Sequence, residues 1–63
     1  MPTNIKAEVA KGANIIIRNN LLSKKEKIKQ LFYHFRLYFP NDTQDELFQL
    51  SLDYYEYKMD KKN

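Results

Sequence analysis

Residues 39–46, on which the fold depends, read Phe39-Pro40-Asn41-Asp42-Thr43-Gln44-Asp45-Glu46. Pro40 disfavours helical geometry at the residue before it, so a helix is expected to end near Phe39. The next two residues are typical of a turn. Thr43 and Glu46 form a capping box, in which each side chain accepts a hydrogen bond from a backbone N–H at the start of a helix. The segment therefore predicts a helical hairpin with a short loop.

Residues 23–39, before this turn, have the pattern of an amphipathic helix. Ser23 and Glu26 form a second capping box. One face of the helix would carry the apolar residues Ile28, Leu31, Phe32, Phe35, Tyr38 and Phe39. Residues 23–39 hold five basic residues and one acidic residue, whereas residues 43–60 hold five acidic residues and one basic residue. The short loop and the opposite charges both favour antiparallel pairing of the two helices, and the charges would equally favour an antiparallel dimer.

Residues 4–20 predict a further helix, with Thr3 or Asn4 as its cap and two asparagines at its end. Its apolar face would carry Ile5, Val9, Gly12 or Ala13, and Ile16. Two features disagree with a helix. Gly12 lowers helix stability by about 1 kcal/mol relative to Ala, and the β-branched run 15–17 is also compatible with a short strand. We nevertheless expect a helix here.

The expected architecture is a single all-α domain over residues 1–63, a small three-helix bundle built on an antiparallel helical hairpin at residues 23–60. A chain of 63 residues without Cys has no disulfide to stabilise it, so aromatic packing by its five Tyr and four Phe, or oligomerisation, is the expected source of stability. No apolar run exceeds three residues, so no transmembrane helix is expected. The N-terminus has no apolar signal segment, and a cytoplasmic location is expected.

The helix predicted at residues 43–60 carries two apolar stripes, whose centres lie roughly 150° apart. We name the first the Phe48 stripe; it comprises Phe48, Leu52, Tyr55 and Met59. The second, the Leu47 stripe, comprises Leu47, Leu50, Tyr54 and Tyr57. One stripe can face the chain's own core, and the other must meet a partner, a second subunit or water. A tyrosine ring buries a large area and keeps one polar group, so we predict that the Leu47 stripe binds protein.

This prediction depends on the helix at residues 4–20. If that helix covers the Leu47 stripe, the three helices close into a monomeric bundle with the third helix between the other two. If it does not, the stripe is available to another protein or to a second copy of the chain. The expected function is then non-catalytic: the chain binds and regulates or inhibits another protein through its aromatic third helix. Short Lys- and Asn-rich chains of this kind are typical of mobile elements and small regulatory loci.

Catalysis and metal binding are not expected. The polar face of the third helix carries Asp45, Glu46, Gln49, Asp53, Glu56 and Asp60. Carboxylates can act as acids and bases or bind a hard metal, but an open helix face offers no cleft for either task, and we interpret this face as solvated. His34, the one histidine, is interpreted as a residue at the edge of the core, because zinc sites and catalytic triads need partners that this chain lacks. No cofactor is predicted.

Nucleic-acid binding is the alternative function. Lys25, Lys29, Tyr33 and Arg36 are the candidate residues on the second helix, where a basic flank could follow a phosphate backbone. Two features disagree with this reading. The acidic third helix would repel a duplex, and the Gly-containing turn of a helix-turn-helix motif is missing. A basic amphipathic helix can also lie on a membrane surface, but here the same aromatic face is needed for the core.

Overall fold

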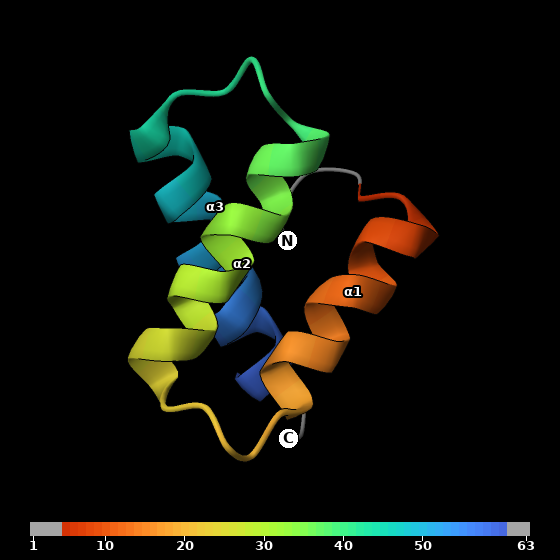
Figure 1. Cartoon of the computed structure of the whole chain (residues 1–63), viewed down its shortest axis with the longest axis vertical. Coiled ribbons are helices and arrows are strands. Elements are labelled where there is room, and N and C mark those ends of the chain that lie inside the picture. Colours follow the sequence, from red (N-terminus) through yellow and green to blue (C-terminus); the bar gives the residue numbers. More distant parts are fainter. Residues whose placement is uncertain (1–4, 61–63) are drawn as a thin grey trace.

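The computed structural model describes residues 5–60, and within them it contains three helices: α1 (Ala7–Arg18), α2 (Lys24–Tyr38) and α3 (Gln44–Asp60). Consecutive helices run in opposite directions, and α2 packs against both α1 and α3 (Figure 1). The predicted all-α three-helix bundle and its antiparallel hairpin are therefore confirmed. The middle position in the bundle belongs to α2 and not to α3, because two short loops place both sequence neighbours of α2 directly beside it.

Both predicted caps hold the ends of the hairpin helices. At the start of α3, Thr43 Oγ1 accepts from the Glu46 N–H at 3.2 Å, and Glu46 Oε1 accepts from the Thr43 N–H at 2.8 Å. At the start of α2, Ser23 Oγ accepts from the Glu26 N–H at 3.2 Å. At the other end, α2 stops at Tyr38, and Phe39 leaves helical geometry with φ −128° and ψ 64°. Pro40 accounts for that stop, as expected.

The start of α1 differs from the prediction. The helix begins at Ala7, with Lys6 at the N-cap position, and the Lys6 side chain makes no capping hydrogen bond. The proposed caps Thr3 and Asn4 lie outside the described residues. The run 15–17 is helical, so the strand alternative is wrong. The helix ends before Asn19, whose Oδ1 accepts from the Leu21 N–H at 3.0 Å and closes the turn toward α2.

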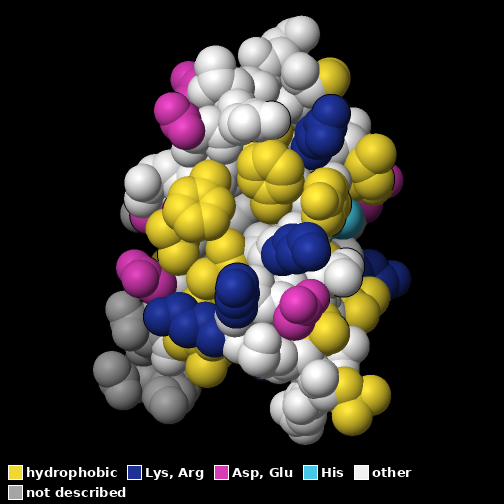
Figure 2. Space-filling view, turned by 60° about the vertical axis from the view of Figure 1, so that its left-hand side comes forward, with side chains coloured by type: hydrophobic (Ala, Val, Ile, Leu, Met, Phe, Trp, Pro, Cys, Tyr) yellow, Lys and Arg dark blue, Asp and Glu magenta, His cyan; other side chains and the backbone are white. Residues whose placement is uncertain are grey.

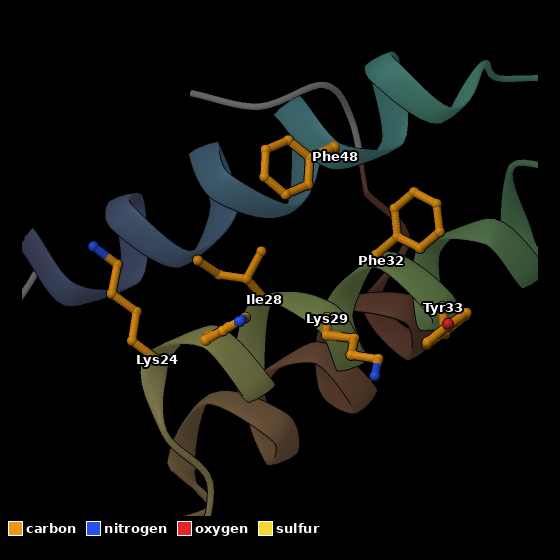
Figure 3. Close-up of a pocket in the computed structure, with 7 residues that line it drawn as sticks. Lys24, Ile28, Lys29, Phe32, Tyr33 and Phe48 are labelled. Atoms are coloured by element: carbon orange, nitrogen blue, oxygen red, sulfur yellow. The ribbon is translucent and has the colours of Figure 1, made fainter.

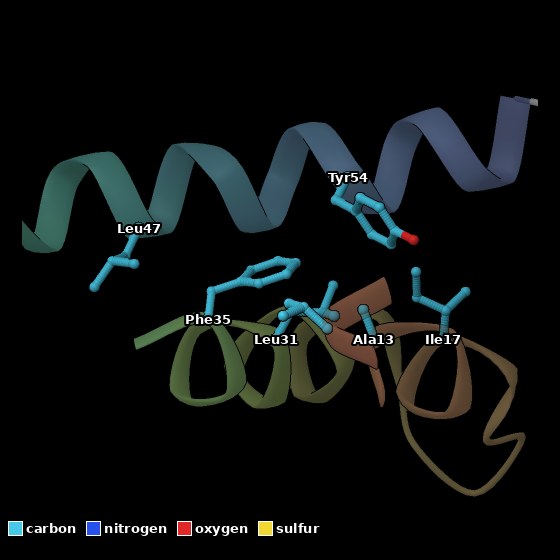
Figure 4. Packing of buried hydrophobic residues seen from close by; sticks show 7 residues of the cluster. Ala13, Ile17, Leu31, Phe35, Leu47 and Tyr54 are labelled. Atoms are coloured by element: carbon cyan, nitrogen blue, oxygen red, sulfur yellow. The ribbon is translucent and has the colours of Figure 1, made fainter. Parts of the chain in front are cut away.

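All three helices contribute to one core. The buried residues are Val9, Ala13 and Ile17 from α1, Ile28, Leu31 and Phe35 from α2, and Leu47, Ser51 and Tyr54 from α3. Figure 4 shows side chains of all three helices converging in the core: Ala13 and Ile17 of α1, Leu31 and Phe35 of α2, and Leu47 and Tyr54 of α3. The Phe35 ring meets the Tyr54 ring edge-on, with centroids 5.7 Å apart. Ile17 rather than the predicted Ile16 completes the buried face of α1, because residues spaced by four line up on the side that faces α2.

The glycine in α1 marks a close contact with α2. His34 Nε2 lies 2.9 Å from the Val9 carbonyl oxygen, which accepts the hydrogen bond. The ring then lies over Gly12, where an added Cβ would be 2.5 Å from His34 Cε1 and 2.8 Å from Nε2. Glycine is therefore required at this position by its neighbour on α2, which offsets its low helix propensity. The interpretation of His34 as a half-buried residue at the core edge is confirmed.

Candidate functional site: a groove between α2 and α3

The structure places the Leu47 stripe, predicted to bind protein, largely inside the molecule. Leu47 is 2% exposed and Tyr54 is 4% exposed, while Leu50 and Tyr57 are half-buried. Leu47 and Tyr54 share one buried cluster with residues of α1 and α2. The stripe is therefore not the accessible surface that the sequence analysis expected. The binding role predicted for the Leu47 stripe required that the first helix leave it uncovered, but α1 and α2 together cover it.

Tyr54 shows that this side of α3 has a structural role. Its hydroxyl donates to Asn14 Oδ1 on α1 at 3.2 Å, which ties the first and third helices together. The Lys58 ammonium lies 5.7 Å from the centre of its ring. Burial raises the pKa of the Tyr54 phenol above its ordinary value of 10.0, and the nearby Tyr57 raises the pKa further. Both effects favour the neutral phenol that the hydrogen bond to Asn14 requires.

The Phe48 stripe is the one that reaches the surface. Phe48 is 51% exposed and Met59 is 39% exposed, whereas Leu52 and Tyr55 are half-buried. The helix does carry two apolar stripes, but the Leu47 stripe is the more buried of the two and the Phe48 stripe is the more exposed. The buried side also includes Ser51, whose hydroxyl donates to the Leu47 carbonyl at 2.8 Å and so is satisfied within its own helix.

Phe48 forms one wall of a groove of about 700 Å³ between α2 and α3, which we name the α2–α3 groove. The residues lining it are Ile28, Phe32, Tyr33, Phe48, Lys24, Lys25 and Lys29. Figure 3 shows Ile28 and Phe32 projecting from α2 toward Phe48 on α3, with Lys29 and Tyr33 on the outer side of α2. Of the described residues that line the groove, none is acidic. The groove thus has an apolar floor and a basic rim.

Lys24 links the two walls at one end of the groove. Its ammonium lies 5.8 Å from the centre of the Tyr55 ring, so it extends from α2 toward α3. In a projection along the helix axis, Lys24 lies on the opposite flank of α2 from Lys25 and Lys29. A flexible four-carbon side chain can cross that distance, which a projection along the helix axis does not represent.

Tyr33 separates the groove from a second hollow. The Tyr33 and Phe32 rings meet edge-on with centroids 5.6 Å apart. Beyond Tyr33 lies a hollow of about 570 Å³ lined by Tyr33, Arg36, Leu37 and Pro40. Figure 2 shows large hydrophobic side chains side by side on this face, with Lys and Arg below and at the upper right and with Asp and Glu along the left edge. Apolar and basic side chains therefore continue along most of α2.

The four candidate nucleic-acid-binding residues all lie on this face. Lys25, Lys29, Tyr33 and Arg36 are exposed, and each lines one of the two hollows. The structure therefore brings together the residues of the alternative function, whereas it buries half of those assigned to the main one. Tyr33, the one aromatic residue of this set, lies beside Phe32, so two rings stand on the same face as the basic side chains.

The acidic side of α3 is solvent-exposed at Asp45, Glu46, Gln49, Asp53 and Glu56. Gln49 Nε2 donates to Asp53 Oδ1 at 2.9 Å along the helix surface. Within residues 5–59, no group of three His, Cys, Asp or Glu side chains is placed to hold a metal ion. No helix in the described part of the chain is long and apolar enough to cross a membrane.

Sequence reasoning missed Phe48 as a surface residue and assigned Ile28 and Phe32 to the core alone. The signal was present in the two stripes of α3, but it did not show which of them faces inward. The two tyrosines of the Leu47 stripe favoured a binding surface, but Tyr54 is only 4% exposed. Comparison of the chain with known protein families, with curated proteins and with solved structures gave no match, so the geometry of this face is what bears on function.

Proposed function

We propose that this chain is a non-catalytic protein-binding domain that regulates or inhibits another protein through the α2–α3 groove. The observation that supports it is the half-exposed Phe48 ring, which stands opposite Ile28 and Phe32 above an apolar floor. The functional surface therefore lies on the other side of α3 from the Leu47 stripe. A cytoplasmic site of action fits the absence of Cys.

The α2–α3 groove combines aromatic anchor residues with a rim of side chains that can keep water out. Binding hot spots are enriched in large aromatic side chains that fill desolvated pockets and are surrounded by residues that keep water out. Phe32 and Phe48 supply the rings, and the lysine stems can cover the edge of the apolar floor while their ammonium groups stay in water. A contiguous exposed apolar patch with a polar border is typical of protein interaction sites.

A pull-down from the native host tests the proposal, with the tagged chain compared to its Phe48→Asp and Leu21→Asp variants. Leu21 is the matched control, because it is 94% exposed and does not line the groove. We expect the wild type and Leu21→Asp to retain the same protein and Phe48→Asp to lose it. Circular dichroism should show equal helicity for all three, since a half-exposed residue near the start of α3 tolerates an acidic side chain. Retention of the same partner by Phe48→Asp would contradict the proposal.

The grouping of Lys25, Lys29, Tyr33 and Arg36 on one exposed face supports single-stranded nucleic acid as a second candidate ligand. Proteins of that class combine a basic groove with aromatic rings on which bases stack. Their affinity for nucleic acid falls steeply with salt, and each phosphate contact removed lowers the log–log slope by about 1. Absence of oligouridine binding at low salt would eliminate this candidate.

A further inference from the structure

We infer that the occupant of the α2–α3 groove is an acidic amphipathic helix of a partner protein, lying along α2. The inference rests on the proposed function and adds the chemistry and shape of the partner. An amphipathic helix is recognised when its apolar face lies in a groove and its anchors follow a helical spacing.

The apolar floor has the shape that such a helix needs. Ile28 and Phe32 are one turn apart on α2, and Phe48 faces them from α3 (Figure 3). The floor is thus a trough between two helices and not a closed pocket. Apolar side chains at positions i, i+3 or i+4, and i+7 of a third helix would enter it in sequence.

The basic residues set the charge and the length of the occupant. Lys25 and Lys29 are exposed one turn apart at one end of this face, and Arg36 is exposed at the other end beside Tyr33. At 1.5 Å per residue the row from Lys25 to Arg36 spans about 16 Å, which corresponds to about three turns of a partner helix. Acidic residues flanking its apolar anchors would meet this row. Complementary charges across an interface favour the correct partner and its orientation.

A second copy of the chain fits this groove less well. A twofold dimer brings the same patch of both copies together, so the three lysines at the rim would face an equally basic patch. Nucleic acid would satisfy the lysines, but base stacking would use only the exposed rings and would not fill the apolar trough between the two helices. An acidic amphipathic helix would place apolar side chains on the floor of the groove and carboxylates beside the lysines of its rim.

Synthetic helical peptides test the inference directly. The acidic probe is a fluorescent, lactam-bridged peptide of about 16 residues with Leu and Phe anchors at i, i+4 and i+7 and Glu on both flanks. The basic probe replaces each Glu with Lys, and a third probe replaces the anchors with Ala. By fluorescence anisotropy we expect the acidic probe to bind at least about tenfold more tightly than either other probe. Phe32→Ala should weaken acidic-probe binding by a similar factor.

Reversing the charge of the lysines at the groove tests directly whether they determine the preference for an acidic peptide. The variant Lys25→Glu/Lys29→Glu should reverse the preference and favour the basic probe, whereas Lys6→Glu/Lys11→Glu, two exposed lysines on and beside α1, should keep the wild-type preference. Equal binding of both probes to the wild type, or an unchanged preference after reversal at Lys25 and Lys29, would overturn the inference. So would tighter binding of an oligouridine at the same groove, or a dimer in solution that Phe48→Asp dissociates.

The two proposals can fail separately. If the natural partner depends on Phe48 in the pull-down but no acidic probe binds, the protein-binding function stands and the chemistry assigned to the partner is wrong. If Phe48→Asp affects neither partner nor probe, both are wrong.

Discussion

The two sides of α2 meet their neighbours in different ways. On the side of α1, a glycine lets the His34 ring lie directly over the helix backbone, and the ring is held by a 2.9 Å hydrogen bond to Val9. On the side of α3, aromatic residues stand on both helices, and a groove of about 700 Å³ remains open between them. The same helix therefore has one closed interface and one that is closed only on its inner side.

The difference shows how side-chain size affects how closely two helices pack and how much apolar surface stays exposed between them. Gly12 has no Cβ, so nothing keeps the His34 ring away from α1. Phe48 is 51% exposed, whereas Phe32 is half-buried and packs against the core. Below them, Leu47, Ser51 and Tyr54 are buried. The α2–α3 interface thus has a buried inner layer and a partly exposed apolar outer layer.

The largest expected effect is a difference in folding stability between substitutions at two adjacent residues, Leu47 in the inner layer and Phe48 in the outer layer. Leu47→Ala should destabilise the fold by about 2–5 kcal/mol, because it leaves a cavity at a residue only 2% exposed. That is much of the stability of a chain this short, at roughly 0.05–0.15 kcal/mol per residue. Phe48→Ala should cost about 1 kcal/mol or less, since half of its side chain is already in water. Urea denaturation followed by circular dichroism measures both values.

Similar losses at the two positions would mean that the outer layer belongs to the core. Leu21→Ala serves as the reference for an exposed apolar residue outside the groove, and its stability should match that of the wild type. If Phe48→Ala proves more stable than the wild type, the exposed ring is retained at a cost to the fold, as expected for a residue with a binding role.

Most of the fold could be predicted from the sequence because it depends on local signals. The capping boxes, Pro40 and the helical spacing of apolar residues define α2 and α3 to within a residue. The start of α1 could not be predicted as well, because Lys6 makes no side-chain cap and no local signal marks Ala7. The inward face of α3 is also a tertiary property. It is decided by how α1 and α2 cover Leu47 and Tyr54, and no spacing within α3 contains that information.

A smaller effect is expected at the closed interface, where Gly12→Ala tests the contact with His34. The new methyl group would lie 2.5 Å from His34 Cε1, so the ring must move and its hydrogen bond to Val9 is lost or lengthened. The strain of an overpacked site, typically about 1–3 kcal/mol, exceeds the gain of about 1 kcal/mol in helix propensity. We expect a net loss of about 1 kcal/mol in the free energy of unfolding.

A double-mutant cycle isolates the contact. In a His34→Ala background the methyl group meets no ring, so Gly12→Ala should there stabilise the protein by several tenths of a kcal/mol to about 1 kcal/mol. The sign of the Gly12 substitution thus depends on His34. The same sign in both backgrounds would show that the ring does not require the glycine. The α2–α3 groove lies on the other side of α2, so neither substitution should change the binding of the acidic probe.

The smallest expected effect concerns Tyr54, which connects the inner layer of the open interface to α1. Tyr54→Phe keeps the ring against Phe35 but removes the hydrogen bond to Asn14. A single hydrogen bond contributes about 0.5–1.5 kcal/mol net, and we expect a loss near the lower end of that range at neutral pH, because this bond is long at 3.2 Å and only partly buried. Urea denaturation of the two proteins in the same buffer measures the difference. A variant as stable as the wild type would show that α1 is held by apolar contacts alone.

The pH dependence of the stability difference between the wild type and Tyr54→Phe tests whether folding buries the Tyr54 phenol. Because burial raises the pKa of folded Tyr54 above 10.0, the unfolded chain loses this proton first as the pH increases. The stabilisation from Tyr54 is therefore complete below pH 10.0 and is lost as the pH rises through the higher pKa of the folded state. The four other tyrosines are present in both proteins, and only Tyr57 interacts electrostatically with the Tyr54 phenol among the causes of its shift. The stability difference between the wild type and Tyr54→Phe should consequently shrink as the pH rises above 10.0. A constant difference at higher pH would mean that folding does not raise the pKa of the Tyr54 phenol.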